Sequence, residues 1–217
     1  MEPLFSLADI VFGYKSGQPV LNGVDLTLTP GERVALTGPN GSGKTTLLHL
    51  LVGLIRPQSG VVRAFGRERK TEADFRDVRL RAGLLFEDSD NQLFCATVAE
   101  DVAFGPFNLG WARERVADAV TAALKRLDIA HCRDRSPNEL SHGEKRLAAL
   151  ATILAMEPAA LLLDEPTNGL DDSHRETLVR TLRETECALL IASHDRTFLD
   201  KLACRNLHLE SGRFKQR

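Results

Sequence analysis

The sequence contains no long hydrophobic run. None of its apolar stretches approaches the ~20 residues that a membrane-spanning helix needs. Its start, Met1-Glu-Pro-Leu-Phe-Ser, lacks the basic region and apolar core of a signal peptide. We therefore expect a globular protein that contacts any membrane through a partner. A length of 217 residues suits one large domain, or a core with a subdomain.

An excess of charge of one sign is also missing. The 28 lysines and arginines nearly balance the 30 aspartates and glutamates, and both signs are spread along the chain. Nucleic-acid binding usually depends on a basic patch that neutralises phosphates. The composition therefore gives no support to nucleic acid as a partner.

Closely spaced cysteines are absent as well. The four cysteines are Cys95, Cys132, Cys187 and Cys204. Their spacing fits neither a disulfide framework nor a metal-binding motif. We expect reduced thiols in a cytosolic protein.

What the sequence does contain is a phosphate-binding loop. Residues 38–45 read Gly-Pro-Asn-Gly-Ser-Gly-Lys-Thr and fit the pattern G-x-x-x-x-G-K-[ST]. Apolar runs at 34–36 and 47–55 predict the strand before this loop and the helix after it. Backbone N–H groups at the helix start then bind phosphate oxygens, Lys44 reaches the β- and γ-phosphates, and Thr45 holds Mg²⁺. The predicted nucleotide contacts are Gly38, Pro39, Asn40, Gly41, Ser42, Gly43, Lys44, Thr45 and Thr46. The alternative is a glycine turn with a solvated lysine.

Two further apolar runs end in chemically useful side chains. Run 159–163 leads to Asp164 and Glu165, and run 188–192 leads to Ser193 and His194. The carboxyl ends of parallel strands gather ligands at one sheet edge, so we expect these residues near the loop. Asp164 would complete the Mg²⁺ shell begun by Thr45, and Glu165 lies where a base could activate water. Paired acids in an ordinary turn, and a histidine with a local hydrogen bond, are the alternatives.

The hydrophobic pattern predicts an α/β fold in three parts. Segment 10–28 alternates like antiparallel strands, whereas later strands are continuously apolar, as in a parallel sheet. From 97 to 156 the spacing becomes helical, with a helix that Gly105-Pro106 ends and another over 111–128. We predict a phosphate-loop (RecA-like) core with an antiparallel β subdomain and an inserted α-helical subdomain over roughly 92–156.

A second helix start is also a candidate anion site. Ser141 and Glu144 form a capping box, and a helix N-terminus presents N–H groups to anions. A cap needs no glycine at position 143, whereas close approach of a phosphate gives Gly143 a purpose. We add Ser141 and Gly143 to the predicted nucleotide contacts.

In order, these elements resemble the nucleotide-binding subunits of ATP-binding cassette transporters over essentially the whole chain. The matching motifs are Walker A at 38–45, the signature usually written LSGGQ at 140–144, Walker B at 161–165, the D-loop at 168–171 and the switch histidine at His194. Tyr14 falls where the family's aromatic residue stacks on adenine; its residue type alone leaves packing and stacking open. The resemblance implies one ATP-binding cassette over 1–217 that hydrolyses ATP with Mg²⁺.

A closer resemblance is carried by residues 90–94 (Asp-Asn-Gln-Leu-Phe) and 101–110. These look like the ATPases of energy-coupling factor transporters, which include cobalt and nickel importers. The resemblance implies integral membrane partners whose coupling helices dock beside this loop, at the cytoplasmic face of the membrane. Leu93 and Phe94 could line that groove, although core packing of Phe94 fits the sequence equally well.

Two positions depart from the family pattern. Glu87 replaces the Q-loop glutamine that touches Mg²⁺ and the attacking water, and it adds negative charge near the γ-phosphate. We therefore expect an altered Mg²⁺ or pH dependence of hydrolysis. The signature has His142 and Glu144 where the family has Gly and Gln, but it keeps Ser141 and Gly143.

The resemblance implies an incomplete site in each chain. Two cassettes, identical or different, would meet head to tail so that the Ser141 helix faces the partner's γ-phosphate. Glu165 would polarise the water, with His194, Lys44 and Glu87 as the other catalytic residues. The leading interpretation is an ATP-driven importer subunit, for cobalt, nickel or a vitamin. A soluble cassette acting on nucleic acid or ribosomes, and a regulatory subunit with weak hydrolysis, are the alternatives.

Overall fold

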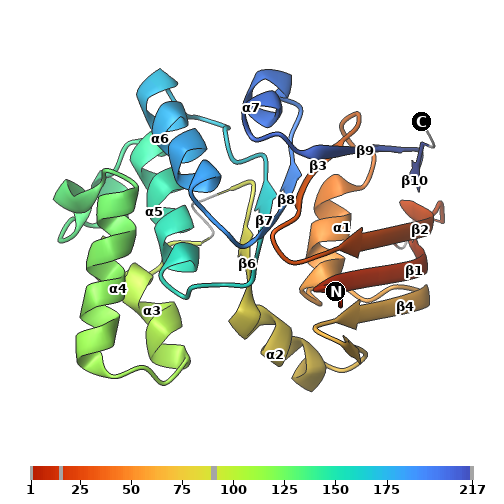
Figure 1. The fold of residues 1–217 in the computed structure, drawn as a ribbon, viewed down its shortest axis with the longest axis horizontal. Helices are drawn as coiled ribbons and strands as arrows, with labels where there is room; N and C mark the ends of the chain where they lie inside the picture. Colours follow the sequence, from red (N-terminus) through yellow and green to blue (C-terminus); the bar gives the residue numbers. More distant parts are fainter. Residues whose placement is uncertain (1, 15–16, 89–91, 216–217) are drawn as a thin grey trace.

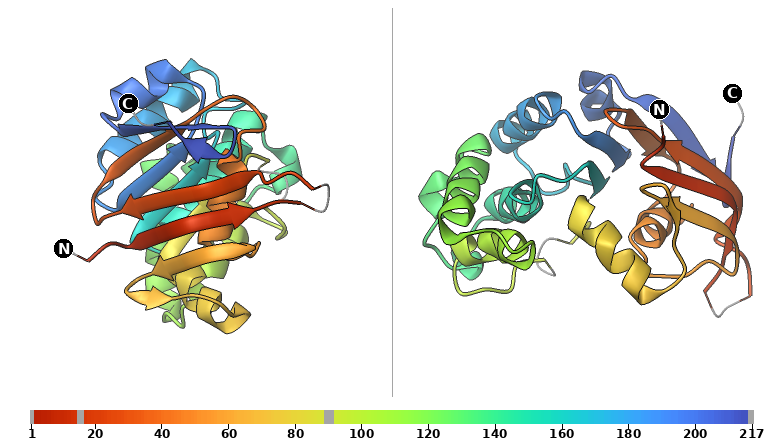
Figure 2. Two further views of the ribbon diagram at one scale, coloured as in Figure 1. Left: turned by 90° about the vertical axis from the view of Figure 1, so that its right-hand side faces the viewer. Right: turned by 60° about the horizontal axis from the view of Figure 1, so that its bottom comes forward.

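The structure is a computed structural model that describes residues 2–14, 17–88 and 92–215 (Figure 1). It consists of two β-sheets, a helix between them, and a group of helices on the far side of the larger sheet (Figures 1 and 2). Among the described residues, every helix is too short or too polar to span a bilayer.

The larger sheet has six strands in the order β10-β9-β3-β8-β7-β6. The strands are β3 Arg33–Thr37, β6 Ala82–Leu85, β7 Ala160–Asp164, β8 Ala188–Ala192, β9 Arg205–Glu210 and β10 Arg213–Phe214. All neighbours are parallel except β9 and β10. Every residue of β7 and β8 is buried, as their continuous apolar sequence predicts for strands covered on both faces.

The smaller sheet is antiparallel, in the order β2-β1-β4-β5. Its strands are β1 Phe5–Phe12, β2 Leu21–Leu28, β4 Ser59–Ala64 and β5 Arg67–Glu68. In β2, buried Val24, Leu26 and Leu28 alternate with exposed residues, so one face packs and the other meets water. That packed face, helix α1 (Lys44–Leu51) and one face of the larger sheet share one hydrophobic core.

The other face of the larger sheet packs against helices. They include α3 (Val98–Asn108), α4 (Arg113–Arg126), α5 (His142–Leu154) and α6 (Asp172–Arg183), with the 3₁₀ turns η2 (Ala130–Cys132) and η3 (Pro137–Glu139) before α5. The two remaining helices are α2 (Glu72–Arg81) and α7 (Arg196–Lys201). The buried stripe of α4 is Val116, Val120, Ala123 and Leu124, which confirms the helical spacing read from the sequence.

Two predicted helix ends were wrong. Helix α3 does not stop at Gly105-Pro106 but continues to Asn108 with Pro106 inside it. Pro106 lies in the last turn, where Leu109 N donates to Gly105 O and the chain still closes its hydrogen bonds. Helix α1 ends at Leu51, although the apolar run continues to Ile55, because Gly53 adopts a left-handed conformation (φ 72°) and Leu54 is half exposed.

Candidate active site

The phosphate-binding loop and the ends of β6 and β7 line one cavity. It measures about 320 Å³ and is more polar than apolar. The predicted site residues that line it are Tyr14, Asn40, Gly41, Gly43, Lys44, Thr45, Thr46, Glu87, Asp164 and Glu165. The fold thus brings together residues that lie up to 151 positions apart in the chain, since Tyr14 and Glu165 both line it.

Glycines give the loop its backbone path. Gly38, Gly41 and Gly43 have φ values of 148°, 76° and 105°, which side-chain-bearing residues rarely adopt. A Cβ atom at Gly38 would lie 2.1 Å from the Leu209 carbonyl oxygen, whereas one at Gly41 would meet nothing within 4 Å. Gly38 is therefore needed for packing against β9, and Gly41 for conformation alone.

Lys44 and Ser42 are poised for an anion. Lys44 is buried, and its Nζ donates to the carbonyl oxygens of Gly38 and Pro39 at 3.0 and 3.3 Å. Ser42 Oγ is buried without a hydrogen-bond partner. A buried hydroxyl without a partner is costly, and a phosphate oxygen would satisfy it. These donors fit a nucleotide phosphate.

The residues expected at Mg²⁺ are adjacent. The Thr45 hydroxyl is hydrogen-bonded to Asp164, whose Oδ2 is buried without a partner. Burial is the main cause that raises the pKa of Asp164 to about 6, and the negative charges of Glu87 and Glu165 add to it. A hydroxyl and carboxylates are the hard oxygen ligands that Mg²⁺ takes, so this group fits the ion.

Glu165 and His194 contact each other at the ends of β7 and β8. Glu165 is buried at φ 42°, a conformation that strains a residue other than glycine. Its Oε2 lies 3.0 Å from His194 Nδ1 and accepts hydrogen bonds from Ser193 Oγ (3.2 Å) and His194 N (3.4 Å). The His194 side chain is mostly exposed. Two neighbouring strand ends therefore hold a carboxylate that can accept a proton and an imidazole that can turn toward a ligand.

Arg146 is a positioning residue that the sequence reading missed. It is buried in α5, and its guanidinium donates to the carbonyl oxygens of Asp164 (2.6 Å), Glu165 (2.7 Å) and Glu87 (2.8 Å). Further bonds reach Phe86 and Pro166, so that one side chain ties the ends of β6 and β7 together. Burial lowers the pKa of this guanidinium, while the acids of the site oppose that change. The sequence feature that could have identified Arg146 is its basic side chain, one turn after the start of a largely apolar helix.

Tyr14 presents its ring beside the loop. The side chain is 53% exposed, its ring meets Phe12 edge to face, and its hydroxyl lies 3.3 Å from Thr46 Oγ1. An exposed aromatic face next to a phosphate site is available to stack on a base.

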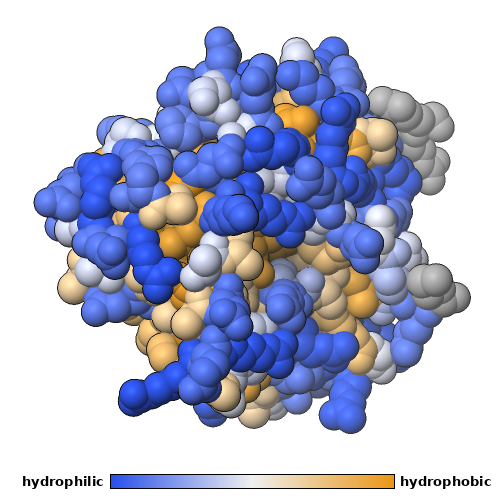
Figure 3. All heavy atoms as spheres, turned by 60° about the vertical axis from the view of Figure 1, so that its left-hand side comes forward, coloured by the Kyte–Doolittle hydropathy of each residue, from blue (hydrophilic) through white to orange (hydrophobic). Residues whose placement is uncertain are grey.

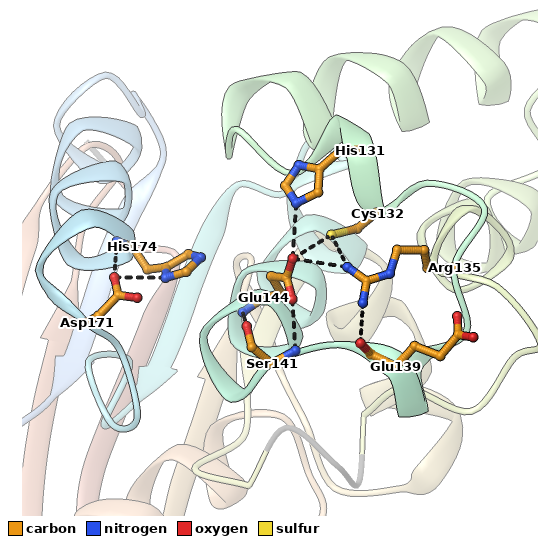
Figure 4. Close-up of polar contacts among 8 residues, drawn as sticks. All are labelled: His131, Cys132, Arg135, Glu139, Ser141, Glu144, Asp171 and His174. Atoms are coloured by element: carbon orange, nitrogen blue, oxygen red, sulfur yellow. Dashed lines mark hydrogen bonds and ion pairs between the residues drawn. The ribbon is translucent and has the colours of Figure 1, made fainter.

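The Ser141 helix start is not among the residues that line this cavity. The capping box is confirmed, because Ser141 Oγ accepts from Glu144 N and Glu144 Oε2 accepts from Ser141 N (Figure 4). At Gly143, a Cβ atom would lie 2.8 Å from His174 Nδ1 of α6. Packing against His174 is thus a second reason for this glycine, beside the close approach of a phosphate predicted from the sequence.

Beside the Q-loop region an apolar groove reaches the surface. The residues lining it include Val52, Leu54, Phe94, Phe104, Ile153 and Met156, and hydrophobic residues emerge among hydrophilic ones on this side of the molecule (Figure 3). Phe94 is 67% exposed and meets Phe104 edge to face, so the core-packing alternative for Phe94 was wrong; Leu93 is the core residue. Of the motif at 90–94, Asp90 and Asn91 lie outside the described residues.

A comparison with protein families identifies the family of this chain. The model described as "ABC transporter" matches residues 21–168, well over half of the chain. The chain belongs to the ABC transporter family. It is an ATPase, and ATP and Mg²⁺ are the ligands of such cassettes.

Curated relatives and solved structures extend this result. A putative ABC transporter ATP-binding protein of Brucella suis is 47% identical, covering 98% of this chain and 88% of that protein. The nickel import ATP-binding protein NikO of Rhodobacter capsulatus is 42% identical, with coverage of 98% and 88%. The energy-coupling factor transporter ATP-binding protein EcfA of Methanothermobacter thermautotrophicus is 39% identical, with coverage of 96% and 68%.

Two similar structures show the same fold. CbiO1 of Clostridium perfringens, part of an ABC transporter complex, has a TM-score of 0.87 at 32% identity, covering 100% of this chain and 88% of that chain. A bacterial ABC transporter cassette solved as a dimer has a TM-score of 0.90 at 25% identity, with coverage of 98% and 97%. The predicted phosphate-loop α/β fold is confirmed.

Proposed function

We propose that this cassette hydrolyses ATP to power an energy-coupling factor type importer of nickel or cobalt ion. The observation that carries the ATPase assignment is the convergence of Lys44, Thr45, Asp164 and Glu165 on one cavity. The importer class and a nickel cargo are supported by the names of two similar proteins, a nickel import ATP-binding protein and an energy-coupling factor transporter ATP-binding protein. CbiO1, part of an ABC transporter complex, is the structural neighbour that accompanies them.

We assign the chemistry as follows. Mg²⁺ would be held by Thr45, Asp164 and Glu87, and it would neutralise charge that develops on the phosphates. Residues 38–46, Lys44 among them, hold the triphosphate, and Tyr14 stacks on the base. Glu165 accepts a proton from the attacking water. His194 leaves its contact with Glu165 and positions the γ-phosphate.

Each chain supplies part of two pockets in this proposal. Ser141 and Gly143 lie outside the cavity that contains Lys44, and the helix N-terminus that they form offers N–H groups without a phosphate to bind. ABC ATPases dimerise, and a head-to-tail second cassette would bring its own Ser141 to this chain's nucleotide. The whole chain, 1–217, then acts as one cassette with a helical subdomain at roughly 92–156.

The apolar groove is the proposed contact with the membrane component. Exposed aromatic rings beside an apolar depression suit an amphipathic helix, and Phe94 and Phe104 supply such rings. The cassette would therefore lie at the cytoplasmic face of the membrane, held there by integral membrane proteins, with no nucleic acid involved.

Transport measurements test the cargo. Cells that carry the cassette with its co-purified membrane partners should accumulate nickel or cobalt ion, and Glu165→Gln should abolish that uptake. The exposed control Glu184→Gln should leave it intact. Energy-dependent uptake of a vitamin, with metal uptake unchanged by Glu165→Gln, would refute the metal assignment but not the ATPase.

A regulatory subunit with weak hydrolysis remains the second candidate because of Glu87. Its carboxylate lines the cavity and adds to the charge that raises the pKa of Asp164. Slow hydrolysis by the wild-type chain in its membrane complex, accelerated by Glu87→Gln, would favour this candidate.

A further inference from the structure

Three side chains converge on one oxygen of Glu144, away from the ATP cavity. His131 Nε2 lies 3.0 Å from Glu144 Oε1, the Cys132 thiol donates to the same oxygen at 3.3 Å, and Arg135 Nη1 donates to it at 3.2 Å. Figure 4 shows all three pointing at this carboxylate. The other oxygen, Oε2, is occupied by Ser141 N at 2.8 Å. Glu144 thus caps the N-terminus of α5 with Oε2 and contacts His131 and Cys132 of η2 with Oε1.

The donor atoms suit a transition-metal ion. His131, Cys132 and Glu144 offer a nitrogen, a sulfur and a carboxylate oxygen, all within 4.8 Å of one another. Around a tetrahedral ion with bonds of about 2.0–2.3 Å, such atoms lie roughly 3.3–3.8 Å apart. Small side-chain movements would therefore bring them onto one ion, with a fourth position left for water. Sulfur and imidazole ligands select Zn²⁺, Co²⁺ or Ni²⁺ over Mg²⁺.

A cation already occupies this place in the free chain. The Arg135 guanidinium lies 3.2 Å from Glu144 Oε1 and 3.9 Å from Cys132 Sγ. Its side chain is 37% exposed, and its remaining bond is to the carbonyl oxygen of Glu139. Arg135 can therefore turn to water when another cation takes its position.

We propose that His131, Cys132 and Glu144 form a binding site for Zn²⁺, Co²⁺ or Ni²⁺, in which the ion replaces the Arg135 guanidinium. A metal–sulfur bond forms as the S–H bond of Cys132 breaks, and the proton passes to solvent. Glu144 binds the ion through Oε1 alone, so that Oε2 keeps its bond to Ser141 N. The charges of the ion, the thiolate and the carboxylate then cancel.

The position of the site connects it to catalysis. The ion joins η2 to the first turn of α5, which contains Ser141 and Gly143. Under the proposed function that turn binds the partner's nucleotide, so the free concentration of a transition-metal ion would alter ATP hydrolysis. The effect on ATP hydrolysis rests on the proposed function, whereas the binding site does not.

Cobalt titration of the full-length reduced chain, without ATP, tests the site. One Co²⁺ per chain should bind and produce a thiolate-to-cobalt charge-transfer band in the near ultraviolet. Cys132→Ser should lose the band, and the matched control Cys204→Ser should keep it. Loss of outer-sphere partners weakens metal sites about 10–100-fold, so His131→Ala, which removes a ligand, should weaken binding at least about 10-fold. Arg135→Ala should bind Co²⁺ more tightly than the wild type.

Several results would overturn the proposal. These are the absence of a saturable band in both the wild type and Arg135→Ala, a band that survives in Cys132→Ser, or displacement of Co²⁺ by excess Mg²⁺. Circular dichroism of the metal-free variants checks their folding. If Cys132→Ser does not fold, His131→Ala carries the same test because the His131 side chain is 59% exposed. Because binding is measured without ATP, its failure is distinct from failure of the proposed ATPase.

Discussion

Glu165 is the residue whose chemistry is most narrowly defined by its surroundings. It is buried at the end of β7, and Ser193 and His194 both contact its Oε2. A carboxylate held in this way can accept a proton, whereas an amide of the same shape cannot.

We expect Glu165→Gln to bind ATP and accumulate a closed dimer while hydrolysis falls about 10²–10⁴-fold, the usual contribution of a general base. Phosphate release and gel filtration in ATP measure the two effects. Glu184→Gln, an exposed change at the C-terminal end of α6, is the control. Normal turnover in Glu165→Gln would remove this residue from the proposed role.

Glu87 stands where the family resemblance places the Q-loop glutamine. Its side chain is exposed to the cavity, while Arg146 holds its carbonyl oxygen at 2.8 Å. The backbone is therefore fixed while the carboxylate remains free to reach an ion.

For Glu87→Gln we expect the Mg²⁺ concentration at half-maximal hydrolysis to rise several-fold, because a charged oxygen ligand becomes a neutral one. Steady-state rates over a Mg²⁺ series, with Glu114→Gln as a surface control, give the comparison. Superimposable Mg²⁺ curves for the two variants would show that Glu87 does not contact the ion.

At the scale of single elements, helix caps explain several boundaries. Capping boxes begin α2, α3 and α5 at Thr71, Thr97 and Ser141. The box at Ser141 was predicted from sequence, and Thr97 with Glu100 fits the same local S/T-x-x-E pattern. In α2 the reciprocal residue is Asp74 instead of glutamate.

Asp74 makes the stability of the chain depend on pH. Hydrogen bonds from the Thr71 and Lys70 backbone lower the pKa of Asp74 from its ordinary 3.8 to about 2. A lowered folded-state pKa means that the stabilisation is complete above about pH 4 and is lost as the pH falls toward about 2. In urea unfolding across this window, Asp74→Asn should lose less stability on acidification than the wild type. An equal loss in Asp74→Asn and in the exposed control Asp118→Asn would contradict the prediction.

At the scale of the whole molecule, the Walker A loop and the Ser141 helix start lie in different parts of the fold. The Walker A loop connects β3 of the larger sheet to α1, which lies between the two sheets, whereas the Ser141 turn starts α5 on the other face of the larger sheet (Figure 1). Ser141 and Gly143 are not among the residues that line the ATP cavity. Under the proposed function, a second chain would complete each pocket.

Mixing two inactive variants tests this arrangement. Lys44→Ala and Ser141→Arg should each abolish hydrolysis, whereas their equimolar mixture should regain up to about a quarter of wild-type activity. Random pairing makes half of the dimers mixed, and each mixed dimer has one intact pocket of two. Recovery only after addition of a different cassette would identify a heterodimer. Full activity of a strictly monomeric chain would contradict shared pockets altogether.

The sequence by itself determined the features that depend on local backbone patterns. The Walker A loop, the buried strands β7 and β8, the stripe of α4 and two capping boxes all follow from residues within a few positions of each other. The meeting of Thr45 with Asp164 was also foreseen, because parallel strands end at one sheet edge. The family resemblance then supplied the roles that these side chains are proposed to have.

Only the tertiary structure decided which distant side chains meet. No periodic or local pattern in the sequence predicts three of these contacts. They are the bonds of Arg146 to the ends of β6 and β7, the packing of His174 on Gly143, and the convergence of His131, Cys132 and Arg135 on Glu144. The same holds for the exposure of Phe94 and the continuation of α3 past Pro106. Such contacts depend on how whole elements pack together, and packing is determined by the combined shape of many side chains instead of the spacing of a few.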